Sequence, residues 1–200
     1  MTSFSWLHFS DLHRGMPEQA ESWSRIKKVI FEDVGKLYTQ CGPWNLVLFT
    51  GDLTHSGSKE QFKQVDEFLN ELWEEFAKLG HLESTTPQLL AVPGNHDLVW
   101  PENPKAPAVA VLLKWSQHEE VWDDFWDLKK TSDYREVINE AFKNYSDWWK
   151  EQEYKPKNIC DGILPGDFSV TIENKDGAKN PFRKSQLPDF LAFCGLKPSK

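Results

Sequence analysis

Three short apolar runs stand out in the first hundred residues. Residues 4–10 and 89–92 are each long enough for one strand, and residues 46–49 form the continuous apolar run Leu-Val-Leu-Phe. A strand that is buried on both faces has such a run, whereas a strand with one face in water alternates between apolar and polar residues. We therefore predict a strand at each of the three runs.

Two helices are predicted between these strands. Apolar side chains recur at intervals of three and four over residues 23–37, which is the period of an amphipathic helix. Ser58 and Gln61 form a capping box ahead of a second helical pattern over residues 62–79. The order strand, helix, strand, helix, strand is typical of a parallel sheet with crossover helices.

The pattern changes in residues 98–160. Prolines open this segment, and helical stretches are predicted at about 108–129 and 133–153, both rich in tryptophan. We interpret the segment as a helical insert over one end of the sheet. Tryptophans at helical spacing predict a packed core for the insert; the alternative is an aromatic surface that binds a protein partner or stacks a base.

The last part of the chain gives contradictory signals. Residues 168–173 alternate like a strand and residues 175–177 (Lys-Asp-Gly) are a hairpin-turn signal, so a return strand should follow. Residues 180–184 instead read Asn-Pro-Phe-Arg-Lys, a segment broken by proline that lacks a strand pattern. We therefore expect one domain over residues 1–180 and a non-native or disordered tail over residues 181–200.

Composition and charge narrow the class of protein. Hydrophobic residues make up 39% and charged residues 27% of the 200 residues, which favours a packed core over wholesale disorder. The net charge of −8 argues against a general nucleic-acid-binding surface, so a nucleic acid is expected only as a substrate. Three cysteines, far apart in the sequence, favour free thiols over a disulfide framework.

Neither a signal peptide nor a membrane span is predicted. The first residues lack a basic segment followed by a long apolar run. The longest apolar stretch, residues 106–113, is too short to cross a bilayer. We expect a cytoplasmic protein that does not act on membranes.

Side chains that carry chemistry follow directly after the three predicted strands. They form the blocks Asp11-x-His13, Gly51-Asp52 and Gly94-Asn95-His96-Asp97. Parallel strands end at one edge of an open α/β sheet, where ligands bind, so the three loops should meet there. Carboxylate and amide oxygens together with imidazole nitrogens suit Mn, Zn or Fe. The three blocks, in this order, indicate a metal site.

These blocks resemble a known family. The segments Leu7-His8-Phe9-Ser10-Asp11-Leu12-His13, Gly51-Asp52-Leu53-Thr54 and Gly94-Asn95-His96-Asp97 are similar to the first three motifs of the calcineurin-like metallophosphoesterases. The resemblance covers residues 4–100 well and residues 160–177 loosely. It implies a layered α/β/β/α sandwich, here with an incomplete C-terminal part, and hydrolysis of phosphate esters by a phosphodiesterase or phosphatase.

The resemblance also implies two divalent transition metals, Mn, Zn or Fe. Asp11 and His13 would bind the first metal, Asp52 would bridge both, and Asn95 would bind the second. Two ions about 3.5–4 Å apart can stabilise both the attacking and the leaving oxygen of an in-line displacement.

Histidines are assigned different roles. The resemblance implies that His96 is not a ligand but contacts the phosphate and helps the leaving group, with Asp97 orienting it from behind. His8 is expected to be a packed core residue. The remaining histidines outside the motifs are expected at the surface or at helix ends; they are His55, His81 and His118.

One part of the family pattern is absent. The family completes its site with a later histidine and a G-H-x-H motif, whereas no histidine follows His118 here. Two hypotheses therefore stand side by side: a metal-dependent phosphoesterase, or a truncated, frameshifted or degenerate relative that folds partly or acts only by contact.

Overall fold

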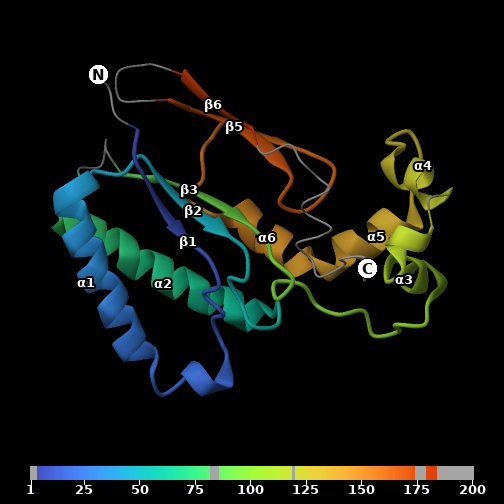
Figure 1. Cartoon of the computed structure of the whole chain (residues 1–200), viewed down its shortest axis with the longest axis horizontal. Coiled ribbons are helices and arrows are strands. Elements are labelled where there is room, and N and C mark those ends of the chain that lie inside the picture. The colour runs from blue at the N-terminus through green and yellow to red at the C-terminus, as the bar shows by residue number, and fades with distance from the viewer. Residues whose placement is uncertain (1–3, 82–85, 119, 174–178, 184–200) are drawn as a thin grey trace.

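A parallel three-stranded sheet lies at the centre of the protein. The computed structural model describes residues 4–81, 86–118, 120–173 and 179–183. Strands β1 (Trp6–Phe9), β2 (Leu46–Thr50) and β3 (Gln88–Val92) are ordered β1-β2-β3 and pair in parallel (Figure 1). Val47 and Phe49 in the middle strand are fully buried, as the continuous apolar run predicts. The three predicted strands are thus confirmed.

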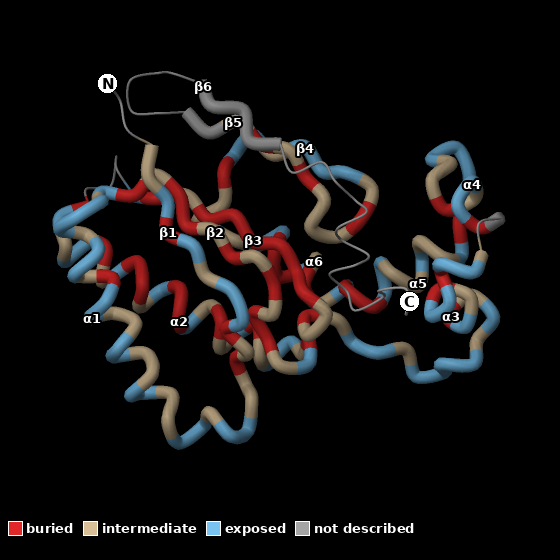
Figure 2. Tube along the Cα trace, viewed as in Figure 1, coloured by how far each residue is buried: buried red, intermediate tan, exposed pale blue. Residues whose placement is uncertain are grey.

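The crossover helices cover one face of this sheet. After a short 3-10 turn, η1 (Pro17–Gln19), α1 (Trp23–Cys41) connects β1 to β2, and α2 (Lys59–Lys78) connects β2 to β3 (Figure 1). The Oγ of Ser58 accepts a hydrogen bond from the backbone N–H of Gln61 at 3.3 Å, which caps α2 as predicted. The buried stripe of α2 faces the sheet, so it closes this side of the core (Figure 2).

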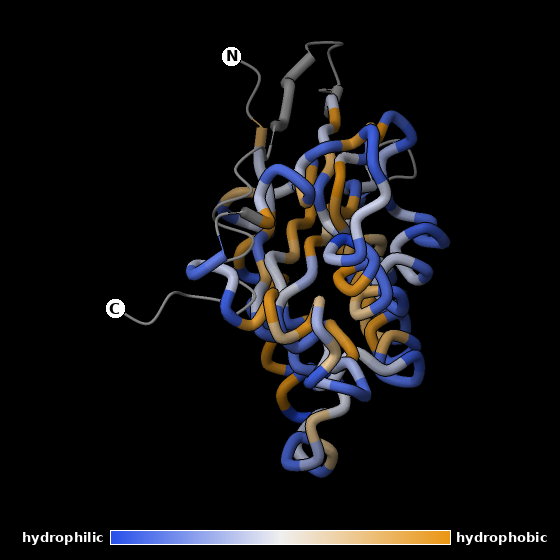
Figure 3. The backbone as a smooth tube through the Cα atoms, turned by 90° about the vertical axis from the view of Figure 1, so that its right-hand side faces the viewer, coloured by the Kyte–Doolittle hydropathy of each residue, from blue (hydrophilic) through white to orange (hydrophobic). Residues whose placement is uncertain are grey.

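A second, antiparallel sheet supplies another side of the same core. It consists of β4 (Ile159–Asp161), β5 (Phe168–Glu173) and β6 (Lys179–Arg183) in the order β4-β5-β6. Phe168 and Val170 of β5 belong to one buried cluster with the side chains of the first sheet and α2. Segments of hydrophobic residues accordingly run through the middle of the molecule, and segments of hydrophilic residues surround them (Figure 3).

The strand β6 corrects one prediction. We expected no strand after the turn signal, yet residues 179–183 pair with β5, with Thr171 opposite Pro181 and Val170 opposite Phe182. Proline is tolerated here because β6 is an edge strand, which needs only one row of its backbone groups in the ladder. The expected turn at 175–177 and residues 184–200 lie outside the described residues, whereas 181–183 belong to the fold.

The helical segment is more divided than predicted. In place of one helix at about 108–129, the structure has α3 (Pro107–Leu112), a 3-10 turn η3 (Trp115–Gln117) and α4 (Glu120–Trp126). In place of one helix at 133–153, α5 (Asp133–Ala141) and α6 (Lys143–Glu151) are separated at Phe142. Helices α3 and α4 project beyond the sheet (Figure 1), and with α5 and Leu164 they bury a small second cluster around Trp115 and Phe125.

Helix α6 belongs to the main core and not to a separate insert. The hydroxyl of Tyr145 donates to the carbonyl oxygen of Ala91 at 2.8 Å, and the Trp149 ring stacks on Phe168 with centroids 5.6 Å apart. The N–H of Leu89 donates to the carbonyl of Tyr154 at 2.8 Å. The outer edge of β3 is therefore covered by α6 and the residues after it, which protects an otherwise open strand edge.

The described helices are all too short or too polar to cross a lipid bilayer.

Candidate metal centre

The first two motif loops lie side by side beyond the ends of β1 and β2. The N–H of Asp11 donates to the carbonyl of Gly51 at 3.2 Å, and the N–H of His13 donates to the carbonyl of Asp52 at 2.8 Å. The parallel pairing of the strands thus continues into the loops, with a further bridge between Arg14 and Thr54. This register places the side chains of both motifs at one edge of the sheet, as predicted.

The backbone at the motif residues is strained. Within the described residues, the non-glycine residues with positive φ are Asp11 at 56°, His13 at 46° and Asp52 at 52°. A left-handed conformation costs a non-glycine residue about 1–3 kcal/mol, and such strain concentrates at functional sites. Its occurrence at these three motif residues marks the loops as a site whose side-chain directions matter.

Asp11, His13 and Asp52 form a set that fits a metal ion. The Nε2 of His13 lies 3.8 Å from Oδ1 of Asp11 and 4.0 Å from Oδ2 of Asp52, and one ligand atom from each residue lies within 4.8 Å of the other two. The second ring nitrogen of His13, Nδ1, is buried and has no hydrogen-bond partner among the described residues. Two carboxylates and an imidazole are donors that divalent transition metals accept.

The third motif loop is locked onto the second. The backbone N–H of His96 donates to Oδ1 of Asp52 at 3.0 Å, so the other carboxylate oxygen is the one nearest His13. A Cβ on Gly94 would lie 2.2 Å from Oδ1 of Asp52, a contact that no side chain tolerates. Asn95 lies between these residues in the turn, with its side chain half-buried.

Asp97 joins the second motif loop to the third. It is fully buried, and its carboxylate accepts hydrogen bonds from the N–H groups of Leu53 (3.1 Å), Thr54 (2.7 Å) and Gly94 (2.8 Å) and from the Thr54 hydroxyl (2.8 Å). These bonds tie the second motif loop to the third. Burial raises the pKa of Asp97, and the hydrogen bonds oppose that shift.

The His96 ring is oriented by the main chain of His55. Its Nδ1 lies 2.9 Å from the carbonyl oxygen of His55, and because a carbonyl can only accept, this nitrogen carries the proton. The expectation that Asp97 orients His96 stays a prediction, and the ring has this main-chain partner in addition. The His96 ring meets the His13 ring edge to face at 4.6 Å, which brings the third motif to the first.

His55 was missed as a site residue. We expected it at the surface or at a helix end, yet its half-buried ring stacks on that of His96 with centroids 5.8 Å apart. One ring nitrogen from each of His13, His55 and His96 lies within 4.8 Å of the other two. The sequence contains no signal for this location, because it depends on how the loop after Asp52 folds back to pair with Arg14.

Two other histidines also differ from expectation. His8, predicted in the core, is exposed on β1, and its Nε2 lies 2.7 Å from the hydroxyl of Thr50. His81, predicted at the surface or at a helix end, follows the end of α2, but it is buried and stacks on Trp44 with centroids 5.9 Å apart. Neither belongs to the metal-binding groups found in the described residues.

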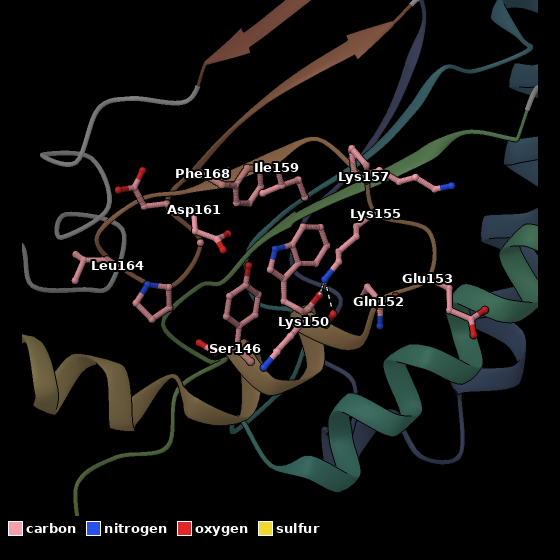
Figure 4. Close-up of a pocket in the computed structure, with 16 residues that line it drawn as sticks. Ser146, Lys150, Gln152, Glu153, Lys155, Lys157, Ile159, Asp161, Leu164 and Phe168 are labelled. Atoms are coloured by element: carbon pink, nitrogen blue, oxygen red, sulfur yellow. Dashed lines mark hydrogen bonds between the residues drawn. The ribbon is translucent and has the colours of Figure 1, made fainter.

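A large cavity lies elsewhere in the molecule. It has a volume of about 590 Å³ and opens between α6 and the strands β4 and β5, with Lys150, Lys155 and Asp161 among the residues that line it (Figure 4). The described residues of its wall do not include those of the three motif loops. We therefore place the candidate site at the motif loops, where the side chains can hold a metal.

Comparison with known families agrees with this geometry. The family described as calcineurin-like phosphoesterase matches residues 4–197. The chain belongs to the calcineurin-like phosphoesterase family. This match confirms the resemblance found in the motifs and extends it through the helical segment, beyond residues 4–100. The family consists of metal-dependent phosphoesterases that typically bind divalent metals. A comparison with curated proteins gave no match.

Proposed function

We propose that this calcineurin-like phosphoesterase hydrolyses phosphate esters, either diesters or monoesters, with the help of a divalent transition metal. The observation that carries the proposal is the convergence of Asp11, His13 and Asp52, all in left-handed backbone conformations, within 4.8 Å of one another. The two three-stranded sheets with α1 and α2 would form the front of the layered α/β/β/α sandwich typical of the family.

Asp11, His13 and Asp52 would hold the ion. Asp11 is exposed, with 68% of its side chain accessible, so an ion and a substrate can reach the set from solvent. A divalent ion held there would supply Lewis-acid polarisation of a phosphoryl oxygen and neutralise its charge. Asn95, in the adjacent turn, would offer an amide oxygen for a second ion.

His96 is the proposed proton donor. Its Nδ1–H is engaged by the His55 carbonyl, so Nε2 has a lone pair in the neutral ring and, when the ring is protonated, donates to a phosphate oxygen or to the departing oxygen. The edge-to-face contact with His13 keeps this ring beside the metal-binding set. His96 would thereby touch the substrate, whereas Asp97 would position the loops that carry His96 and Asp52.

The balance of ligands favours one tightly held ion. The first ion would have Asp11, His13 and Asp52 as ligands, whereas among the motif residues only Asp52 and Asn95 would hold the second. The same observation supports a second candidate function, a metal-binding family member that does not catalyse. Both candidate functions predict metal binding at Asp11, His13 and Asp52, but only the phosphoesterase predicts turnover of a phosphate ester.

Turnover with an aryl phosphodiester and an aryl phosphomonoester, each with added Mn²⁺, tests the proposal. We expect metal-dependent release of the aryl alcohol by the natural chain and none by Asp52→Asn. His8→Ala is the matched control, because His8 lies exposed on β1 outside both metal-binding groups. Metal binding without turnover on either substrate would favour the non-catalytic candidate.

A further inference from the structure

A second group of metal-binding side chains overlaps the first. His13, His55 and His96 come from three different motif loops, and one ring nitrogen from each lies within 4.8 Å of the other two. Zinc–nitrogen bonds of about 2.0–2.1 Å place two ligating nitrogens of a tetrahedral site about 3.3–3.4 Å apart. Small rotations of the rings would bring the three nitrogens to that spacing.

Two of these imidazoles have a buried ring nitrogen that makes no hydrogen bond within the described part of the chain. The Nδ1 atoms of His13 and His55 are buried and lack a hydrogen-bond partner among the described residues. A buried polar atom without a partner is costly, and an ion is one of the partners that remove the cost. The unpaired atoms thus belong to two of the three residues that could hold the ion.

The third imidazole has the protonation pattern of a metal ligand. His96 donates its Nδ1–H to the His55 carbonyl at 2.9 Å, which leaves the lone pair of Nε2 free in the neutral ring. Metal-binding histidines commonly donate their other N–H to a backbone carbonyl in this way. The same hydrogen bond that orients His96 also prepares it as a ligand.

We propose that His13, His55 and His96 form a nitrogen-only metal site that takes zinc-type ions and competes with the Asp11–His13–Asp52 set for His13. The metal site itself rests on the proposed function only in that both sets use His13, whereas the inhibition also rests on the proposed role of His96 as proton donor. Three imidazoles suit Zn²⁺ or Ni²⁺, whereas a set with two carboxylates suits Mn²⁺. An ion on the three histidines removes His96 from proton donation, so zinc bound there inhibits the reaction that manganese supports.

Metal binding by the apoprotein tests this site without reference to activity. Titrations of Mn²⁺ and of Zn²⁺ are followed by calorimetry for the natural chain, for His55→Ala, for Asp11→Asn and for the control His8→Ala. His55→Ala keeps the main-chain carbonyl that holds His96, so it removes one ligand and leaves the His96 hydrogen bond in place. His55→Gln, which keeps a polar side chain, serves if the alanine variant does not fold.

The proposal predicts opposite effects of the two changes. His55→Ala should weaken Zn²⁺ binding at least about tenfold, since even the loss of an outer partner of a ligand costs about 10–100-fold, and should leave Mn²⁺ binding within about threefold. Asp11→Asn should weaken Mn²⁺ more than Zn²⁺. Equal effects of His55→Ala on both ions, or none on Zn²⁺, would overturn the three-histidine site. An affinity for Mn²⁺ that is unchanged in Asp11→Asn would instead overturn the proposed function.

Discussion

At the scale of single residues, the site depends on backbone conformations that few side chains accept. Asp11, His13 and Asp52 all have φ near +50°, where aspartate and histidine are tolerated better than β-branched or bulky residues. The guanidinium of Arg14 lies 3.7 Å from the centre of the Trp23 ring, which holds the first motif loop against α1. This contact helps to hold the strained loop in place.

His96 and Asp52 should respond differently to substitution. With Mn²⁺, Asp52→Asn should abolish turnover together with metal binding, because it removes a ligand charge. His96→Asn should lower kcat about 10²–10⁴-fold while the chain keeps its Mn²⁺, because its proposed role is proton transfer. Steady-state kinetics and elemental analysis of the same samples measure both effects. A His96 variant that loses Mn²⁺ in proportion to its activity would show that His96 is a ligand of the manganese site.

Asp97 should make stability depend on pH. Its pKa is raised in the folded chain, so the folded state binds the proton more tightly than the unfolded state does. Its contribution to the free energy of unfolding therefore declines as pH rises from 3.8, the ordinary value, through the folded pKa. In urea denaturation at a series of pH values, the excess stability of the natural chain over Asp97→Asn should be largest in acid and shrink as pH rises. Asp33→Asn, an exposed change on α1, is the control. A difference that grows with pH would reverse the sign of the argument.

At the scale of elements, helix α6 joins the two sheets. It presents Tyr145 to β3, Trp148 to α2 and Trp149 to β5, and the indole N–H of Trp148 donates to Asp66 at 2.7 Å. Without α6 the outer edge of β3 would have unpaired backbone groups. The segment that the sequence marks as an insert is thus divided: α3 and α4 project outward, and α6 completes the core.

Tyr145→Phe tests this connection. The change deletes one hydroxyl and leaves the buried carbonyl of Ala91 without its donor, so we expect a loss of about 1–3 kcal/mol in the free energy of unfolding. Tyr154→Phe is the matched control: its hydroxyl donates to Asn70 at a solvent-exposed position and should change stability by less than about 0.5 kcal/mol. Chemical denaturation of both variants measures the difference. Equal losses in the free energy of unfolding would contradict a stabilising role of the hydrogen bond between Tyr145 and Ala91.

Sequence patterns predict some of these elements better than others. The run at residues 46–49 is predictable because a strand buried on both faces is continuously apolar. The stripe of α2 is predictable because a helix buried on one face has apolar residues at the helical period. Strand β6 is not, because Pro181 is acceptable only at the edge of a sheet, and edge position depends on pairing with distant residues. The break between α5 and α6 at Phe142 likewise reflects packing against the core and no local stop signal.

The same limit applies to the site. Asp11, His13, Asp52 and the third motif could be placed at one sheet edge because each follows a parallel strand. The position of His55 depends on how its loop folds back to pair with Arg14, which no spacing reveals. The pairing of Asp97 with the second loop is equally a tertiary contact.

At the scale of the whole molecule, an acidic chain concentrates its metal-binding side chains at one edge of a parallel sheet. The net charge of −8 attracts cations and repels anionic phosphate esters. A phosphate ester would therefore bind favourably only after a cation is bound. Family membership, the strained motif loops and the convergent ligands all agree with a metal-dependent phosphoesterase. On the proposed assignment, the first ion would have three ligands from the motif loops and the second would have two.

The number of Mn²⁺ ions per chain tests this account most directly. After loading with Mn²⁺ and dialysis, elemental analysis should give one ion per natural chain and close to none for Asp52→Asn, with His8→Ala unchanged. Two retained ions would show that other residues complete the second site. One ion retained equally by Asp52→Asn would contradict the account, because the ion would then lie outside the Asp11–His13–Asp52 set.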